Sequence, residues 1–184
     1  MCRSAPNRLT RLVDTIWPDA KTLDTRPGTT VMSTTRHTAQ IDAPPAHVYR
    51  ALLDPLLIPQ WRVPTDMRCE VHEFEPREGG AFRVSLTYDS PTSAGKSTAQ
   101  TDTYSGYFEQ LLPNERVVER LAFETTDPQM QGEMRITTDL AAVGGGTRVT
   151  VVHEGLPPGV TPADNETGWH ESLTKLAALL TPAS

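Results

Sequence analysis

The spacing of apolar residues along the chain changes twice, and each change predicts a different kind of element. Residues 34–41 are rich in threonine, which is typical of a strand. Apolar residues then recur at helical spacing over 42–53, and Asp42 or Ala43 is expected to cap this helix. The prolines that follow predict a second short helix or turn, which ends at Trp61.

Beyond that tryptophan the apolar period drops to two. The clearest case is Phe82-Arg-Val-Ser-Leu-Thr-Tyr88, in which apolar and polar residues alternate strictly. The same alternation, with turn-forming residues between the segments, predicts further strands at residues 67–74, 100–111, 116–124, 131–141 and 147–154. Consecutive strands joined by short turns indicate an antiparallel meander with one buried face.

The C-terminal segment returns to a helical period. Thr161-Pro-Ala-Asp164 is typical of a capped helix start, because proline is tolerated in the first turn and a carboxylate follows at the third helical position. An apolar stripe then runs through Trp169, Leu173, Leu176, Ala177 and Leu180, long enough to lie across the sheet. The predicted fold class is therefore α+β, with a strand, two short helices, about six more strands and one long helix.

Composition and charge narrow the possible partners. The chain has 184 residues and a net charge of −6 without a cluster of Lys and Arg, which argues against nucleic acid as a partner. No apolar run approaches the roughly 18 residues of a membrane-spanning helix. Cys2 and Cys69 form no CxxC pair, which favours a reducing, cytoplasmic setting. The five histidines have no metal-binding spacing, so we expect neither a metal nor a cofactor.

Two segments need a separate interpretation. Residues 1–32 show little apolar periodicity, and we expect a poorly ordered extension ahead of a domain that spans 33–184. Gly95-Lys96-Ser97 matches the last three residues of a phosphate-binding loop. However, Ser90 stands where that motif needs its first glycine, and a strand pattern follows where it needs a helix. We therefore expect a hairpin loop that binds no nucleotide.

Five stretches, taken in order, resemble one protein family. They are "IDAPPAHVYRALLDPLLIPQW" (41–61), "REGG" (77–80), "GYFEQLLPNERVV" (106–118), "GTRVTVVHEG" (146–155) and "GWHESLTKLAALL" (168–180). In these stretches the chain is similar to the START-like (SRPBCC, helix-grip) proteins, and most similar to bacterial homologues of the activator of heat-shock protein 90 ATPase. The resemblance implies a curved antiparallel sheet of about seven strands around a long C-terminal helix, with two short helices after the first strand.

Proteins of this fold commonly hold an apolar cavity between sheet and helix, so the resemblance implies a site for a small hydrophobic or amphipathic molecule. The ligand-binding residues expected from the parity of each strand and of the long helix, together with the tryptophan that ends the second helix, are Trp61, Val84, Leu86, Tyr88, Phe108, Leu121, Phe123, Met134, Ile136, Val151, His153, Trp169 and Leu173. The sequence assigns no catalytic residue.

A few polar residues near this face carry alternative interpretations. A neutral His153 could bond a ligand carbonyl or act as an acid or base, or it could be a core histidine paired with a backbone group or a tyrosine. Arg62 stands where the family often has a second tryptophan. It is either a charged group suited to an anionic ligand end or a solvated arginine whose stem lies on Trp61. Tyr88 and Tyr104 could orient a ligand or place their hydroxyls at the surface.

Three functions follow from these features. The resemblance and the lack of a catalytic motif favour a binding protein that holds a small hydrophobic ligand without turnover. The first alternative is a cyclase- or dehydratase-type enzyme for a polyketide-like substrate, with His153, a tyrosine and Arg62 in the site. The second is a chaperone-linked interaction domain, and a homodimer is also compatible with the sequence.

Overall fold

The computed structural model describes residues 33–89, 97 and 100–181. The expectations for residues 1–32 and for Gly95 and Lys96 lie outside these residues. The elements, in chain order, are β1 (Ser33–Ile41), α1 (Pro45–Leu52), α2 (Ile58–Trp61), β2 (Met67–Phe74), β3 (Ala81–Tyr88), β4 (Thr101–Leu112), β5 (Arg116–Phe123), β6 (Met134–Val143), β7 (Gly146–Leu156) and α3 (Pro162–Leu180).

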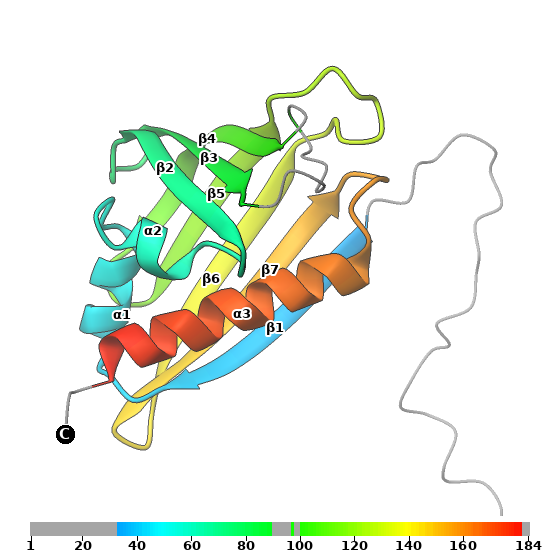
Figure 1. Cartoon of the computed structure of the whole chain (residues 1–184). Helices are drawn as coiled ribbons and strands as arrows, with labels where there is room; N and C mark the ends of the chain where they lie inside the picture. Colours follow the sequence, from blue (N-terminus) through cyan, green and yellow to red (C-terminus); the bar gives the residue numbers. More distant parts are fainter. Residues whose placement is uncertain (1–32, 90–96, 98–99, 182–184) are drawn as a thin grey trace, which may run out of the picture. The chain divides into compact units, whose positions relative to one another are not determined.

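The strands form one antiparallel sheet in the order β1-β7-β6-β5-β4-β3-β2. Strands β2 to β7 follow one another as a meander, and β1 joins the open edge beside β7. The long helix α3 lies across one face of this sheet, and α1 and α2 stand at the end of the sheet nearest the C-terminal end of α3 (Figure 1). The predicted α+β helix-grip arrangement is therefore confirmed.

The N-termini of α3 and α1 are capped differently. Thr161 caps α3 as predicted, because its Oγ1 accepts a hydrogen bond from the backbone N–H of Asp164 at 3.1 Å. The predicted cap of α1 is wrong, since Pro44 occupies that position rather than Asp42 or Ala43 and no side chain caps the helix. A residue that precedes proline is driven out of the helical region, so two consecutive prolines delay the helix to the second one.

The strand predicted after the Gly95-Lys96-Ser97 motif is also confirmed. β4 begins at Thr101, where a phosphate-binding loop would need a helix. The Ser97 hydroxyl donates to the carbonyl of Thr103 and accepts from its backbone N–H, both at 2.8 Å. The serine of the motif thus uses its hydroxyl to bond the backbone of β4.

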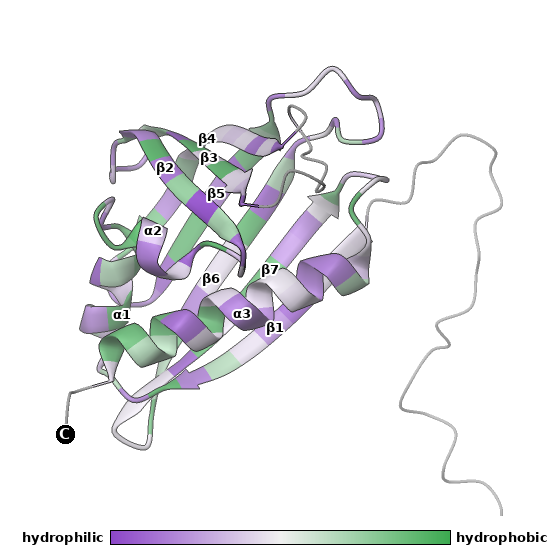
Figure 2. Cartoon of the chain, in the orientation of Figure 1, coloured by the Kyte–Doolittle hydropathy of each residue, from purple (hydrophilic) through white to green (hydrophobic). Residues whose placement is uncertain are grey.

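The inner face of the sheet is apolar and packs against α3. Hydrophobic and hydrophilic bands alternate along the strands (Figure 2), as the period of two requires. Toward α1 the core is filled by three aromatic rings, Phe74, Phe82 and Phe108, whose centroids lie 5.2–6.5 Å apart. Trp61 closes this end and donates its Nε1–H to the carbonyl of Ala51 at 3.1 Å.

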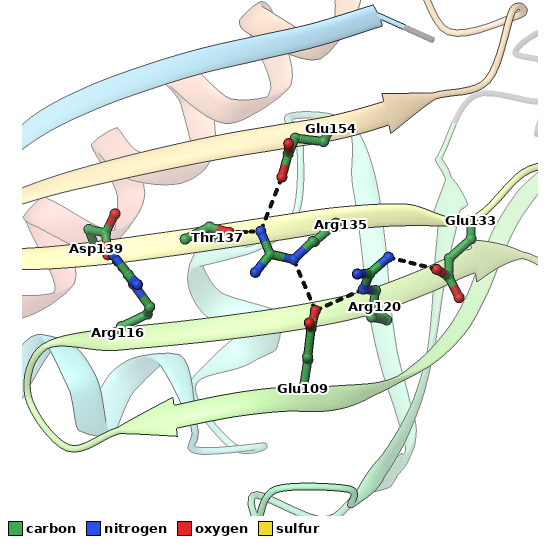
Figure 3. A network of polar contacts seen from close by, with 8 residues as sticks. All are labelled: Glu109, Arg116, Arg120, Glu133, Arg135, Thr137, Asp139 and Glu154. Carbon is green, nitrogen blue, oxygen red and sulfur yellow. Dashed lines mark hydrogen bonds and ion pairs between the residues drawn. The ribbon is translucent and has the colours of Figure 1, made fainter.

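The outer face carries paired charges. Figure 3 shows the carboxylate of Glu109 between Arg120 and Arg135, with N–O distances of 2.7 and 2.9 Å. Arg120 also reaches Glu133 at 2.8 Å, and Arg135 reaches Glu154 at 3.2 Å. Ion pairs this exposed contribute little stability individually. The charged groups of this outer face thus pair with one another, whereas the inner face is apolar.

Candidate functional site

A pocket of about 730 Å³ lies between the sheet and the N-terminal half of α3. Its walls come from every strand from β2 to β7, from α3, and from three connecting segments. One segment follows α2, and Glu171 on α3 holds it by accepting from the backbone N–H of Thr65 at 2.8 Å. The other two, before β6 and after β7, are joined where Gly159 donates its N–H to the carbonyl of Gln129 at 2.7 Å.

Some of the ligand-binding residues predicted from the alternation along the strands line this pocket, and others do not. The predicted residues that line it are Leu86, Tyr88, Leu121, Phe123, Met134, Ile136, His153 and Trp169. The predicted residues that are instead buried in the packed core are Trp61, Val84, Phe108, Val151 and Leu173. Parity identifies which side of a strand faces α3, but it does not say how far along the strand the core is already filled.

Arg62, a residue of the pocket wall, forms a buried ion pair with Glu119. The Nη1 of Arg62 lies 2.7 Å from the Oε1 of Glu119, and the two side chains are only 11% and 6% exposed. The guanidinium also lies over the ring of Tyr104, 5.8 Å from its centroid. Burial alone would lower the pKa of Arg62, but the Glu119 carboxylate raises it, so this group is a permanent cation. The interpretation of Arg62 as a solvated arginine is therefore wrong.

Burial also sets the protonation of the neighbouring groups. It raises the pKa of the Tyr104 hydroxyl to about 12, although Arg62 opposes this shift. It raises the pKa of the Cys69 thiol to about 11, again against the effect of Arg62. Both groups therefore stay protonated at neutral pH. Tyr104 lines the pocket and is buried, so its hydroxyl is not at the protein surface.

His153 is the most unusual polar side chain in the pocket wall. It lies on β7, is 7% exposed, and its Nε2 is buried with no hydrogen-bond partner among the described residues. Its Nδ1 accepts from the Nε1–H of Trp169 at 3.2 Å and from the Nδ2 amide of Asn165 at 3.0 Å. Burial, with smaller effects of Arg62 and His37, lowers the pKa of His153 to about 3. The imidazole is therefore neutral at physiological pH.

A directed chain of hydrogen bonds fixes which nitrogen of His153 carries the proton. Trp169 has only a donor, so Nδ1 must be the acceptor and Nε2 must carry the hydrogen. Asn165 supports this arrangement, because its Oδ1 accepts from the Thr35 hydroxyl at 2.5 Å and its amide is left to donate. His37 in turn reaches that hydroxyl through Nε2 at 3.0 Å. His153 therefore keeps an unused N–H donor, buried in a residue that lines the pocket.

Carboxylates gather at the entrance. We call Asp127, Asp164 and Glu171 the pocket rim; the first two are exposed and the third is half-buried. Asp164 accepts from the Thr161 hydroxyl at 2.7 Å. Hydrogen bonding from the backbone of Thr65 lowers the pKa of Glu171, so that this group stays ionised. The entrance is therefore negatively charged.

The sequence prediction missed several residues that line the pocket, and it also missed Glu119, the buried partner of Arg62. Glu119 had a visible signal, because it occupies an inward position in the alternating row formed with Val117 and Leu121. A lone carboxylate in an apolar row indicates a buried partner. Asn165 and Met130 had no such signal, since their position depends on how α3 and the loop before β6 approach the sheet.

Over residues 33–89, 97 and 100–181, no three His, Cys, Asp or Glu side chains gather in a way that could hold a metal ion. No helix in that part of the chain is long and apolar enough to cross a membrane.

Comparison with solved structures agrees with this architecture. Protein CV1439 from Chromobacterium violaceum is 33% identical, with a TM-score of 0.73 over 82% of this chain and 98% of that one. A protein from Rhodobacter sphaeroides is 23% identical, with a TM-score of 0.67 over 84% and 95%. DynU16, a protein of the dynemicin biosynthetic locus, shares the fold at 22% identity, with a TM-score of 0.56 over 80% of this chain and 46% of that one.

The comparison of sequences identifies the family. No functionally curated protein matches the chain significantly. The sequence model described as "Activator of Hsp90 ATPase homolog 1-like protein" matches residues 42–181, which include every helix and nearly every strand of the described fold. The chain therefore belongs to the family of activator of Hsp90 ATPase homolog 1-like proteins, within the START-like fold.

Proposed function

We propose that this protein binds a small, predominantly apolar molecule in the pocket between α3 and the sheet. The observation that carries the proposal is the buried, unpartnered Nε2 of His153 in the wall of a pocket of about 730 Å³. Pockets that bind small molecules have volumes of roughly 300–1,000 Å³, with mostly apolar walls and a few fixed polar groups. A solvent-free, unpaired N–H costs about 1–3 kcal/mol, and a ligand acceptor that displaces the atoms covering Nε2 recovers that free energy.

The protonation of the pocket groups favours binding over turnover. A general acid or base works best when its pKa is near the operating pH. The pKa of His153 is lowered to about 3 and that of Tyr104 is raised to about 12, so neither group exchanges a proton readily at pH 7. Both groups therefore keep their hydrogens and can bind a ligand through hydrogen bonds without proton transfer. This supports a carrier or sensor of the ligand ahead of the cyclase or dehydratase alternative.

A thermal-shift screen tests the proposal on the full chain. The panel contains neutral aromatic ketones, flavonoids, sterols and fatty acids, and each hit is then titrated up to 100 times its measured dissociation constant. A ligand at that concentration stabilises the folded state by about 2.7 kcal/mol, which raises the Tm by roughly 5–11 °C for a domain of this size.

Two variants on one strand locate the binding site. Leu86→Trp places an indole in the pocket, whereas Thr87→Trp places it on the opposite face of β3, where Thr87 bonds the Thr101 hydroxyl. We expect the shift to disappear in Leu86→Trp and to persist in Thr87→Trp. A shift that survives in both variants would place the ligand elsewhere, and the absence of any shift across the panel would refute the proposal.

A further inference from the structure

The polar groups of the pocket also select the chemistry of the ligand. We infer that the ligand carries a neutral hydrogen-bond acceptor of the carbonyl class, as in a ketone, quinone or lactone, which receives the Nε2–H of His153. This inference rests on the proposed function and adds the substrate class to it. Three independent features of the pocket support it.

The first feature is the direction of the hydrogen bonds around His153. The Nδ1 atom already accepts from Trp169 at 3.2 Å and from Asn165 at 3.0 Å, so it is not available to a ligand. Nε2 carries the hydrogen and is the unpartnered atom. A ligand group that meets this ring must therefore offer an acceptor atom, whereas a group that can only donate, such as an indole N–H, would leave two hydrogens facing each other.

The second feature is that Arg62, the one arginine or lysine among the described residues of the pocket wall, is already neutralised. Arg62 and Glu119 lie 2.7 Å apart in a buried pair. A carboxylate ligand would lose its hydration on entry and would have to compete with Glu119 for the same guanidinium. A buried charge without its own partner is costly. A neutral carbonyl avoids that cost and can still accept from the N–H groups of Arg62 that Glu119 does not use.

The third feature is the charge at the entrance. The pocket rim, Asp127, Asp164 and Glu171, carries three carboxylates. The whole chain has a net charge of −6. Like charges disfavour the approach of an anion and leave the approach of a neutral molecule unaffected. The route into the pocket therefore selects against fatty acids and other carboxylates at neutral pH.

Three naphthalene probes with the same ring separate these possibilities by equilibrium dialysis at pH 7.5. They are 2-acetylnaphthalene, which has a neutral carbonyl, 2-naphthoate, which is an anion, and 2-ethylnaphthalene, which has no acceptor. We expect the ketone to bind at least about fivefold more tightly than either of the others, since it satisfies a buried donor. In His153→Phe the advantage of the ketone over the hydrocarbon should fall below about twofold.

The other outcomes overturn the inference in distinguishable ways. If 2-naphthoate binds most tightly, Arg62 acts as an anion site and the neutral-acceptor class is wrong. If all three bind alike in the wild type and in His153→Phe, the class is wrong while the pocket remains a binding site. If none binds and the thermal-shift screen is also negative, the proposed function and this inference fall together.

A spectroscopic measurement keeps the inference testable even if His153→Phe does not fold. Long-range ¹H–¹⁵N correlation spectra of the ligand-free wild-type protein distinguish the two neutral tautomers of a histidine. We expect His153 with its hydrogen on Nε2. A hydrogen on Nδ1, or a charged ring at pH 7, would remove the donor on which the acceptor class depends.

Discussion

Breaking the buried pair between Arg62 and Glu119 should destabilise the fold strongly, while replacing both partners should not. At the 2.7 Å separation of Nη1 and Oε1, the gross attraction is about 6 kcal/mol for an effective dielectric constant of about 20. The desolvation of two ions, several kcal/mol each, offsets most of it. The pair is therefore close to neutral in net free energy, but either ion alone is an uncompensated buried charge.

The single variant Arg62→Met leaves Glu119 buried without its cation. We expect the free energy of unfolding to fall by about 3–5 kcal/mol, which lowers the Tm by roughly 6–20 °C for a chain of this size. Glu119→Met should have a similar cost, because it leaves the guanidinium unpaired. Arg62→Met/Glu119→Met should recover to within about 1 kcal/mol of the wild type.

Urea unfolding followed by tryptophan fluorescence measures all four proteins and closes a double-mutant cycle. The expected coupling between the two positions is at least about 3 kcal/mol. Additive single effects below about 1 kcal/mol each would refute the reasoning. In that case the pair would be hydrated, and the premise that Glu119 neutralises Arg62 inside the pocket would fail with it.

Two further predictions concern pH and backbone packing. In the unfolded chain His153 takes up a proton at its ordinary pKa of 6.5, whereas in the folded protein its pKa is about 3. The free energy of unfolding should therefore fall as the pH drops from 6.5 toward 3, by about 1.4 kcal/mol per pH unit. Urea unfolding at pH 7, 5.5 and 4.5 measures this dependence, and the slope should be flatter in His153→Gln. The control is His170→Gln, on the exposed side of α3, which should keep the wild-type slope. An equal slope in both variants would contradict the lowered pKa of His153. Gly106→Ala places a methyl group 1.9 Å from the carbonyl oxygen of Arg120 and should cost at least about 2 kcal/mol. Gly168→Ala adds a methyl group in open space on α3 and should stabilise the fold by about 0.5–1 kcal/mol. Urea midpoints that move in the same direction for both glycine variants would contradict the packing described around these two glycines.

Local patterns were sufficient to predict the elements of this fold. Strict alternation from Phe82 to Tyr88 located β3, and the Thr161 to Asp164 signature located the start of α3. These signals are short-range, because they depend on backbone periodicity and on a side chain bonding an amide three residues away. The cap of α1 failed for an equally local reason, since paired prolines restrict the residues before them.

The pocket could be predicted only in part, because its specific chemistry comes from distant pairs. Arg62 meets Glu119 from 57 residues away. His153 takes its partners from α3, which approaches the sheet only after the chain has folded. Alternation shows that Val84 and Leu86 share a face, but not that the first is in the filled aromatic end and the second faces the pocket. That distinction depends on side-chain volumes gathered from several strands.

The central claim is that a small apolar molecule occupies the pocket, and the methionine methyl groups report on it directly. Three of the five methionines, Met67, Met130 and Met134, line the pocket. The measurement is a ¹H–¹³C methyl NMR titration of the full chain with 2-acetylnaphthalene, after each signal has been assigned by a Met→Leu substitution. We predict that these three signals shift together along one saturable curve and that Leu86→Trp abolishes the shifts. Signals that stay unmoved at a saturating ligand concentration, or shifts that persist in Leu86→Trp, would contradict the account.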